Sequence, residues 1–172
     1  MNLDETQIKA VNAKENKIVV LASAGSGKTR VLTERVRKIL EDGANQREVV
    51  AITFTNMAAD EMRARLGDIH EGMFIGTIHS YANKLLTQKG FNTVEILADG
   101  DRFDELFDII KENPEVIEPV KYLLVDEFQD VTKPQFDFFM SINAENFFVV
   151  GDDWQSIYSF NHADVNLFKQ LV

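Results

Sequence analysis

The segment that most constrains the fold of this chain is a glycine-containing run that joins an apolar stretch to an amphipathic one. It is Ala22-Ser-Ala-Gly-Ser-Gly-Lys-Thr29, and it follows the apolar residues 17–22. Glycines there let the backbone pass close to a bound anion and turn its N–H groups toward it. The helix that the spacing predicts over residues 28–40 would add the positive end of its dipole. We therefore predict a strand, a phosphate-binding loop and a helix, in that order.

The residue types in this loop favour a nucleotide as the ligand. In a loop of this pattern the lysine, here Lys28, reaches the β- and γ-phosphates, and the hydroxyl of Thr29 meets Mg²⁺. We expect nucleotide contacts from the whole run: Ala22, Ser23, Ala24, Gly25, Ser26, Gly27, Lys28 and Thr29. Ala22 stands where the pattern usually has glycine, so the match is to its relaxed form. A chance glycine turn before a helix is the alternative.

Apolar runs alternate with helical patterns along the rest of the chain. The apolar runs predict buried strands at residues 17–22, 49–53, 74–77, 122–125 and 147–150. The 3.6-residue spacing predicts helices at residues 4–11, 28–40, 57–66, 78–89, 101–113, 134–142 and 163–171. This alternation indicates an α/β fold of three layers, with a mostly parallel sheet covered by helices on both faces. Ligands of such sheets bind at the carboxyl ends of the strands, and each polar motif here follows a strand.

The predicted strand at residues 122–125 ends in two adjacent carboxylates, Asp126 and Glu127. Asp126 at the end of the strand is placed to hold the Mg²⁺ shell. Glu127 beside it is placed to orient and deprotonate an attacking water. Adjacent acids after a strand are often only a solvated turn, but the phosphate-binding loop upstream favours ATP hydrolysis on this pair. A further strand ends in Gly151-Asp152-Asp153-Trp154-Gln155, where Gln155 could contact a γ-phosphate; a plain surface loop is the alternative.

Composition narrows the class of protein and its location. The 172 residues fit one domain, in which residues 89–120, with two prolines and many acids, are a candidate small helical insertion. The chain lacks cysteine, a signal peptide and any apolar run long enough for a bilayer, so we expect a cytoplasmic protein without membrane contact. The net charge is −10, and residues 95–137 hold 13 acids against 4 bases. The acidic total argues against a general nucleic-acid coat protein but leaves room for a nucleic-acid groove elsewhere, and the acidic block itself is typical of a solvated helical face.

The motifs together resemble the N-terminal motor domain of UvrD/Rep-type superfamily 1 DNA helicases, which has a RecA-like fold. The matching segments follow the order of the family: Leu3, Gln7 and Ala10; then residues 22–30, 52–62, 76–80, 125–130 and 150–160. This resemblance covers nearly all of residues 1–172. It implies ATP and Mg²⁺ as ligands, single-stranded DNA as a partner, and coupling of the two through Gln129 and Gln155.

The resemblance also implies roles for individual residues. Gln7 would bind the edge of the adenine and Arg30 would lie near the base. Six residues would touch single-stranded DNA: Phe54, Thr55, Asn56, Thr77, His79 and Phe160. Aromatic faces stack on any base, which suits Phe54, although a core aromatic is the alternative. For His79 the alternative is a capping or core histidine.

The sequence departs from the family pattern at several places. Met57 stands where a basic residue is usual, and Asn161 stands where an arginine is usual. The interval between Ser80 and Tyr122 is much shorter than the accessory subdomain of the family. The second motor domain, with its arginine finger, would lie beyond Val172. We therefore expect weak ATP hydrolysis and no unwinding by these residues alone, unless a second motor domain or a partner protein acts in trans.

Two other functions compete with a helicase motor. One is a DNA- or protein-binding module that uses ATP as a switch without productive turnover. The other is a P-loop kinase of small molecules, which predicts no DNA affinity and needs a substrate lid that the sequence does not show.

Overall fold

The computed structural model describes residues 3–23 and 25–152. Seven residues named above therefore lie outside the described residues: Ala24, Asp153, Trp154, Gln155, Phe160, Asn161 and Val172. The helix predicted at residues 163–171 lies outside them too.

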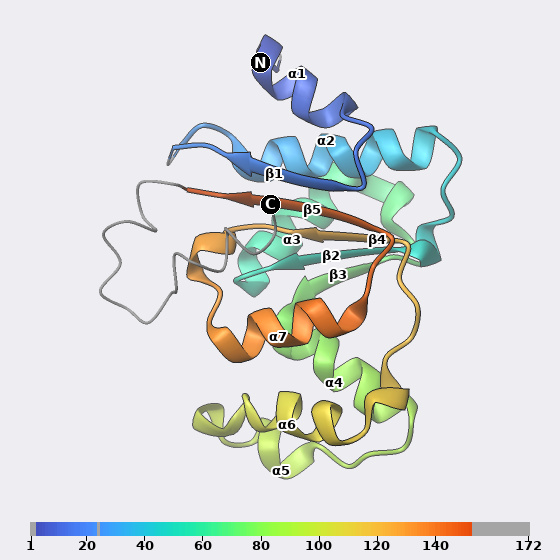
Figure 1. Ribbon diagram of the computed structural model, residues 1–172, viewed down its shortest axis with the longest axis vertical. Coiled ribbons are helices and arrows are strands. Elements are labelled where there is room, and N and C mark those ends of the chain that lie inside the picture. Colours follow the sequence, from blue (N-terminus) through green and yellow to red (C-terminus); the bar gives the residue numbers. More distant parts are fainter. Residues whose placement is uncertain (1–2, 24, 153–172) are drawn as a thin grey trace.

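The centre of the fold is a sheet of five parallel strands in the order β1-β5-β4-β2-β3 (Figure 1). The strands are β1 (Lys17–Leu21), β2 (Val49–Thr53), β3 (Phe74–Thr77), β4 (Tyr122–Val125) and β5 (Asn146–Gly151). All four ladders are parallel, so the carboxyl ends of the strands meet along one side of the sheet, at the left of Figure 1. The predicted α/β class with a parallel sheet is confirmed.

Seven α-helices in the described part of the chain connect and cover these strands. They are α1 (Glu5–Asn12), α2 (Lys28–Glu41), α3 (Asn56–Leu66), α4 (Ile78–Gln88), α5 (Val94–Leu97), α6 (Glu105–Glu112) and α7 (Lys133–Ile142). Asp4 begins α1 through a capping box with Gln7, as the spacing of the two residues predicts. Within the described residues, no helix has the length and apolar character needed to cross a membrane.

The helix predicted at residues 101–113 is wrong in its first turn. The structure has a separate 3₁₀ turn at Gly100–Arg102, where the Asp99 side chain accepts a hydrogen bond from the Asp101 N–H, and α6 begins only at Glu105. The short helix α5 was not predicted, because four residues are too few to show a helical period.

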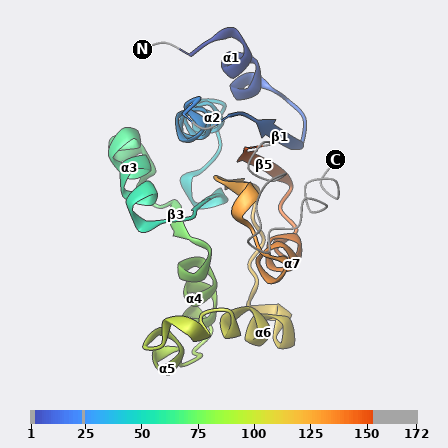
Figure 2. The ribbon, with the colours of Figure 1, turned by 90° about the vertical axis from the view of Figure 1, so that its left-hand side faces the viewer.

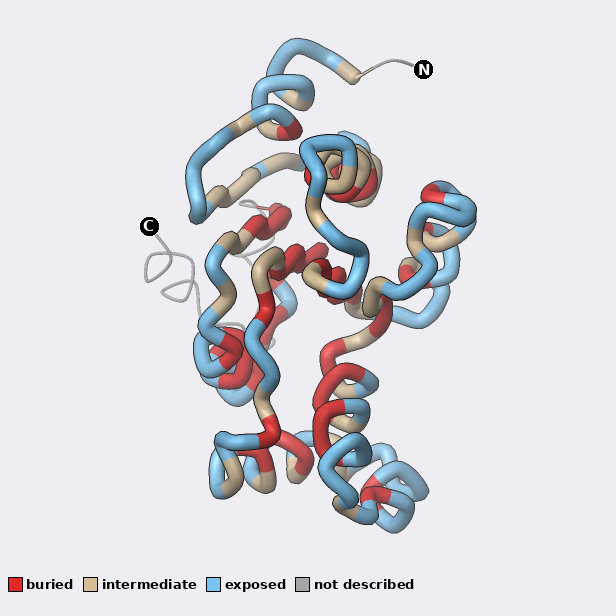
Figure 3. The backbone as a smooth tube through the Cα atoms, turned by 90° about the vertical axis from the view of Figure 1, so that its right-hand side faces the viewer, coloured by how far each residue is buried: buried red, intermediate tan, exposed pale blue. Residues whose placement is uncertain are grey.

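Alternate residues of the strands face two separate cores. Val49 and Ala51 of β2 pack with α2 and α3, whereas Val50 and Ile52 of the same strand pack with α4, α6 and α7. Every residue of β2 is buried, as expected for a strand covered on both faces. Figure 3 shows buried residues gathered along the middle of the molecule, with exposed residues toward its outside. The helices therefore form two layers, with α1, α2 and α3 on one face and α4, α6 and α7 on the other (Figure 2).

Shortening a buried strand residue should unfold the chain more easily. Leu123 of β4 is fully buried in the core beneath α7, so Leu123→Ala should lower the free energy of unfolding by about 2–5 kcal/mol. Met140 on α7 is 43% exposed, and Met140→Ala should change it by no more than about 0.5 kcal/mol. Urea unfolding followed by circular dichroism measures both values, and similar values for the two variants would contradict this assignment of the core.

Candidate functional site

The predicted motifs converge because all five strands end on the same side of the sheet. The order of the strands separates the motifs into two groups. The glycine loop follows β1, Asp152 follows β5 and Asp126 follows β4, whereas Phe54 follows β2 and Ile78 follows β3. Candidate nucleotide residues therefore lie on one half of this side, and candidate DNA residues lie on the other half.

The loop after β1 has the backbone that its glycines predict. Gly25 and Gly27 have φ values of +76° and +82°, a left-handed region that favours glycine. Gly27 directly precedes α2 and caps it without a side-chain hydrogen bond, so the loop meets the positive end of a helix of 14 residues. The ladder between β1 and β5 extends into the loop, since the Ala22 N–H donates to the Gly151 carbonyl at 3.0 Å. This arrangement can bind an anion through backbone N–H groups.

Lys28 is only 7% exposed and lies between two carboxylates. Its Nζ is 3.4 Å from Glu127 Oε2 and 3.8 Å from Asp152 Oδ2. Asp152 itself is 2% exposed. A buried charge is costly unless it is paired, and Lys28 is paired with a carboxylate on either side. The sequence predicted a site role for Lys28 and Glu127 but none for Asp152, which becomes a neighbour only through the pairing of β1 with β5.

Thr29 and Asp126 are in direct contact, although 97 positions separate them. The Thr29 hydroxyl donates to Asp126 Oδ2 at 2.7 Å. Burial raises the pKa of Asp126 and the nearby Glu127 carboxylate raises it further, while the Thr29 hydrogen bond lowers it. Hydroxyl and carboxylate oxygens are the ligand types that Mg²⁺ prefers, so this pair fits a magnesium site.

Gln129 joins the ends of β4 and β5. Its Nε2 donates to Glu127 Oε2 at 2.7 Å, and its Oε1 accepts a hydrogen bond from the Asp152 N–H at 2.9 Å. Gln129 is 4% exposed, so these bonds hold the Glu127 carboxylate from within the protein.

The backbone of Glu127 is in an uncommon conformation. Its φ is +48° and its ψ is +45°, which places a residue with a side chain in the left-handed region. Such a conformation costs of order 1–3 kcal/mol, and it is typical of functional sites. It turns the chain sharply after β4, so that Asp126 and Glu127 both remain beside Lys28.

One open pocket of about 520 Å³ contains most of these residues. It is lined by Gly25, Gly27, Lys28, Thr29, Phe54, Thr55, Ala58, Arg65, Asp126, Glu127, Gln129 and Asp130. Phe54 and Thr55, which were predicted as DNA residues, thus share a wall with the candidate nucleotide residues. Sequence reasoning gave no role to Ala58, Arg65 or Asp130, although Ala58 and Asp130 fall within the matching segments 52–62 and 125–130; Arg65 lies outside every such segment.

A second pocket of about 120 Å³ lies between α1 and the loop, and Gln7 and Ala22 help to line it. Gln7 Nε2 donates to the Ser26 carbonyl at 2.7 Å, which fastens α1 to the loop. Arg30 is half-buried in the first turn of α2, while Ser23 is exposed in the loop.

The remaining DNA candidates differ in how free their side chains are. Asn56 is exposed, and Thr55 and Thr77 cap α3 and α4 by accepting hydrogen bonds from backbone N–H groups. Met57, which replaces a usual basic residue, is 79% exposed.

His79 has contacts within the protein. Its ring lies 5.4 Å from that of Phe103 and 5.2 Å from that of Phe107, measured between centroids. Its Nε2 lies 3.1 Å from Asp104 Oδ1. These contacts support the alternative in which His79 is a core histidine. Its role in DNA binding stays a prediction.

A five-stranded parallel sheet with a glycine loop after its first strand defines a RecA-like P-loop fold. The family model of the UvrD/REP helicase N-terminal domain matches residues 3–117 and 107–172. The chain belongs to this family.

Named relatives agree with this membership. A probable DNA helicase of Mycoplasma pneumoniae is 27% identical over 268 residues, which cover 99% of this chain and 50% of that protein. DNA helicase II of Escherichia coli is 42% identical over 90 residues, 49% of this chain and 12% of that protein. The ATP-dependent DNA helicase PcrA of Staphylococcus epidermidis is 26% identical over 254 residues, 95% of this chain and 35% of that protein. The chain thus spans half the length of the first relative and less of the other two.

The left-handed glycine of the loop can be tested against a matched glycine elsewhere. Gly27→Ala should lower the free energy of unfolding by about 1–2 kcal/mol, because alanine is strained at positive φ. Gly100 has no positive φ and open space around it, so Gly100→Ala should leave stability unchanged or raise it by up to about 1 kcal/mol. Urea titrations of both variants measure the difference. Equal effects at the two glycines would rule out the loop conformation described here.

Proposed function

We propose that residues 1–172 form the RecA-like, ATP-binding first motor domain of an ATP-dependent DNA helicase or translocase. The observation that carries the proposal is the convergence of Lys28, Thr29, Asp126 and Glu127 in a single pocket at the carboxyl ends of the strands. The names of the relatives, which include an ATP-dependent DNA helicase, support the same class of activity.

The proposed nucleotide site uses each side chain for one task. Gln7 and Arg30 would contact the adenine, residues 22–29 would hold the phosphates, and Gln155 would contact the γ-phosphate. Thr29 and Asp126 would hold Mg²⁺, which when bound bridges phosphate oxygens and neutralises their charge. Glu127 would orient and deprotonate the attacking water, while Gln129 keeps its carboxylate in place.

Lys28 would exchange partners when ATP binds. Its ammonium lies beside the Glu127 and Asp152 carboxylates in the structure, and a phosphate oxygen would replace the Glu127 carboxylate. Glu127 would then lose its pairing with Lys28, while its hydrogen bond from Gln129 would keep the carboxylate in position for the water. Lys28 would thus couple the binding of ATP phosphates to the availability of Glu127 as a general base.

Single-stranded DNA is the proposed partner on the other half of the strand ends. Phe54 would stack on a base, which contributes about 1–3 kcal/mol, while Thr55, Asn56 and Thr77 would contact the backbone. Phe160 and His79 are the other residues proposed to contact single-stranded DNA. The ring of His79 also contacts Phe103 and Phe107 within the protein. A cytoplasmic location is part of the same proposal.

Full turnover and unwinding would need a second motor domain, in the same polypeptide or in trans. An arginine supplied across such an interface contributes about 10³–10⁵ in rate in related phosphoryl transfers. We propose that residues 89–120 are a reduced form of the insertion that other members carry. In agreement, the Mycoplasma relative aligns over 268 residues, more than this chain contains.

Replacing the proposed base tests the enzyme against the switch module. Glu127→Gln should lower ATP turnover by at least about 100-fold, because general-base catalysis contributes roughly 10²–10⁴. Binding of Mg-ATP should stay within about threefold, since Thr29, Asp126 and the loop are unchanged. Phosphate release measures turnover, and a fluorescent ATP analogue measures binding with and without EDTA.

Two controls sharpen this test. Lys28→Ala should weaken binding itself, and Glu145→Gln, at an exposed residue between α7 and β5, should change neither quantity. If wild-type turnover is already zero with DNA present, the switch module is the better description.

Nucleotide and DNA should influence each other's binding. Titration of a labelled single strand with and without an ATP analogue, and the reverse titration, should give the same coupling factor. Phe54→Ala should weaken DNA binding and reduce this factor, whereas Met140→Ala on a distant helix should do neither. Binding of ATP with no detectable DNA affinity would favour the small-molecule kinase instead.

A further inference from the structure

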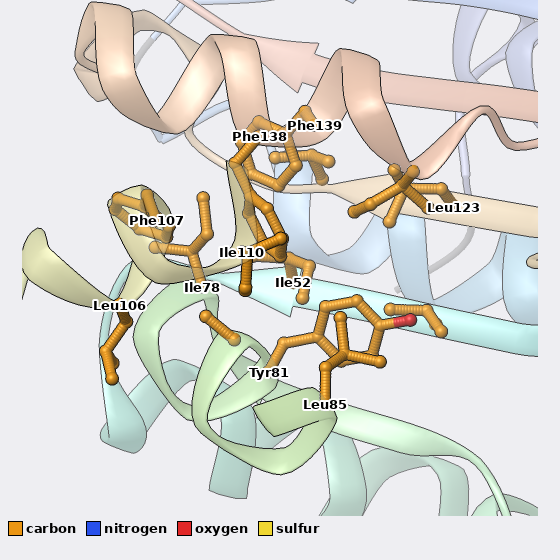
Figure 4. Packing of buried hydrophobic residues seen from close by; sticks show 14 of the residues in the cluster. Ile52, Ile78, Tyr81, Leu85, Leu106, Phe107, Ile110, Leu123, Phe138 and Phe139 are labelled. Carbon is orange, nitrogen blue, oxygen red and sulfur yellow. The ribbon is translucent and has the colours of Figure 1, made fainter. Parts of the chain in front are cut away.

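A second large groove lies away from the strand ends, between α6 and α7. Its volume is about 440 Å³. Phe107 and Ile110 of α6 and Phe138 of α7, which are buried core residues, line its apolar part, and the rings of Phe107 and Phe138 lie 5.2 Å apart (Figure 4). Pro114, Ile117 and Pro134 extend this apolar surface. No motif of the nucleotide site contributes to it.

The walls of the groove exclude an extended peptide that adds a strand to the sheet. Both walls are helices, whose backbone groups are already paired within each helix. Two neighbouring helices instead leave a groove into which side chains of a third helix can insert. Recognition would then depend on apolar residues spaced at i, i+3 or i+4, and i+7 on the incoming helix.

The surroundings of the groove are strongly acidic. Residues 99–118 hold eight acids and two bases, and one of those bases, Arg102, is paired with Glu105. The groove itself is lined by two acids and two bases: Asp108 and Lys111 on α6, and Asp137, which pairs with Lys133, on α7. The excess of negative charge therefore lies around the groove, over residues 99–118, where it would attract a cationic segment and disfavour an anionic one such as DNA.

The groove is built where this chain departs from its relatives. The two matched stretches of the family model overlap at residues 107–117, and six of the eleven lining residues fall within that span. The Mycoplasma relative aligns over more residues than this chain contains. The shorter segment of this chain thus folds into α6 and the turn after it, which form one wall of the groove.

We propose that the groove between α6 and α7 docks a basic, amphipathic helix of a partner protein. The apolar face of that helix would cover the exposed Pro114 and Pro134 and the half-buried Ile117, which lie in the same groove as the buried Phe107 and Phe138. Its lysines or arginines would lie over the acids of α6. The proposal is independent of the nucleotide chemistry, because it uses neither the loop nor the strand ends.

A designed peptide tests the surface directly on the 172-residue chain. The probe is a fluorescein-labelled helix of about five turns made of leucine, lysine and alanine, with leucine on one face. A second peptide has glutamate in place of lysine, and a third has the first composition in scrambled order. Fluorescence anisotropy should show micromolar, saturable binding of the basic amphipathic peptide only, and the affinity should fall as salt is added.

Charge reversal in the groove should abolish this preference. Asp108→Lys combined with Asp137→Lys should weaken binding by at least about tenfold. The matched control, Glu41→Lys with Asp68→Lys, makes the same change in net charge at exposed residues on α2 and after α3. It should weaken binding by less than about twofold if the contact is local rather than a general charge effect.

A second variant tests the groove itself without changing charge. Ser141 is exposed and lines the groove, so the tryptophan side chain in Ser141→Trp should occupy the groove. The affinity for the basic amphipathic peptide should then fall by at least about tenfold. Circular dichroism and ATP binding confirm that each variant is folded. Equal binding of the basic and acidic peptides, equal loss in the control pair, or unchanged affinity in Ser141→Trp would overturn the proposal. Sedimentation that shows self-association through Asp108 and Asp137 would assign the groove to a second copy of the chain instead.

Discussion

The pairing of β5 between β1 and β4 is the constraint on which the site depends. It places the end of β5 beside the glycine loop on one side and beside the end of β4 on the other. Lys28 can therefore meet carboxylates from two different strands, Glu127 after β4 and Asp152 after β5. The strand pairing in turn depends on apolar side chains that are buried on both faces of the sheet.

The balance of charge in this pocket explains which ligands suit it. Three carboxylates, Asp126, Glu127 and Asp130, and two cations, Lys28 and Arg65, line the pocket, and a fourth carboxylate, the buried Asp152, pairs with Lys28. Adding a phosphate chain to such a site requires additional positive charge. A divalent cation held by Thr29 and Asp126 would supply it, so binding of the nucleotide and of Mg²⁺ should depend on each other.

The sequence was most informative where local patterns determine structure. Residues 49–53, 74–77 and 122–125 form strands with the predicted bounds, because fully buried strands are short, continuous apolar runs. The order of strands is a long-range property, and so the contact between Lys28 and Asp152 could not be anticipated from the spacing of motifs. The left-handed conformation of Glu127 was likewise invisible, since no glycine marks it.

The aromatic contacts of His79 show the same limit on the other side of the sheet. The motif around His79 resembles a DNA-binding segment, but the ring packs against Phe103 and Phe107. These contacts depend on how residues 89–120 fold back onto α4, which the sequence around His79 does not determine. A residue in a family motif can thus have a local structural role that its motif does not reveal.

Two separate hydrophobic cores lie on the two faces of the sheet, and each supports a different part of the surface. The loop and α2 pack on the core that contains Val49, Leu124 and Val150, and residues 89–120 pack on the opposite core. The surface beside α7 and the side chains around Lys28 therefore depend on different cores. Phe128 lies between these regions, since it adjoins Glu127 and its ring lies 6.2 Å from that of Phe136 on α7. The packing of α7 against Phe128 thus connects the groove to the ends of the strands that carry the candidate nucleotide site.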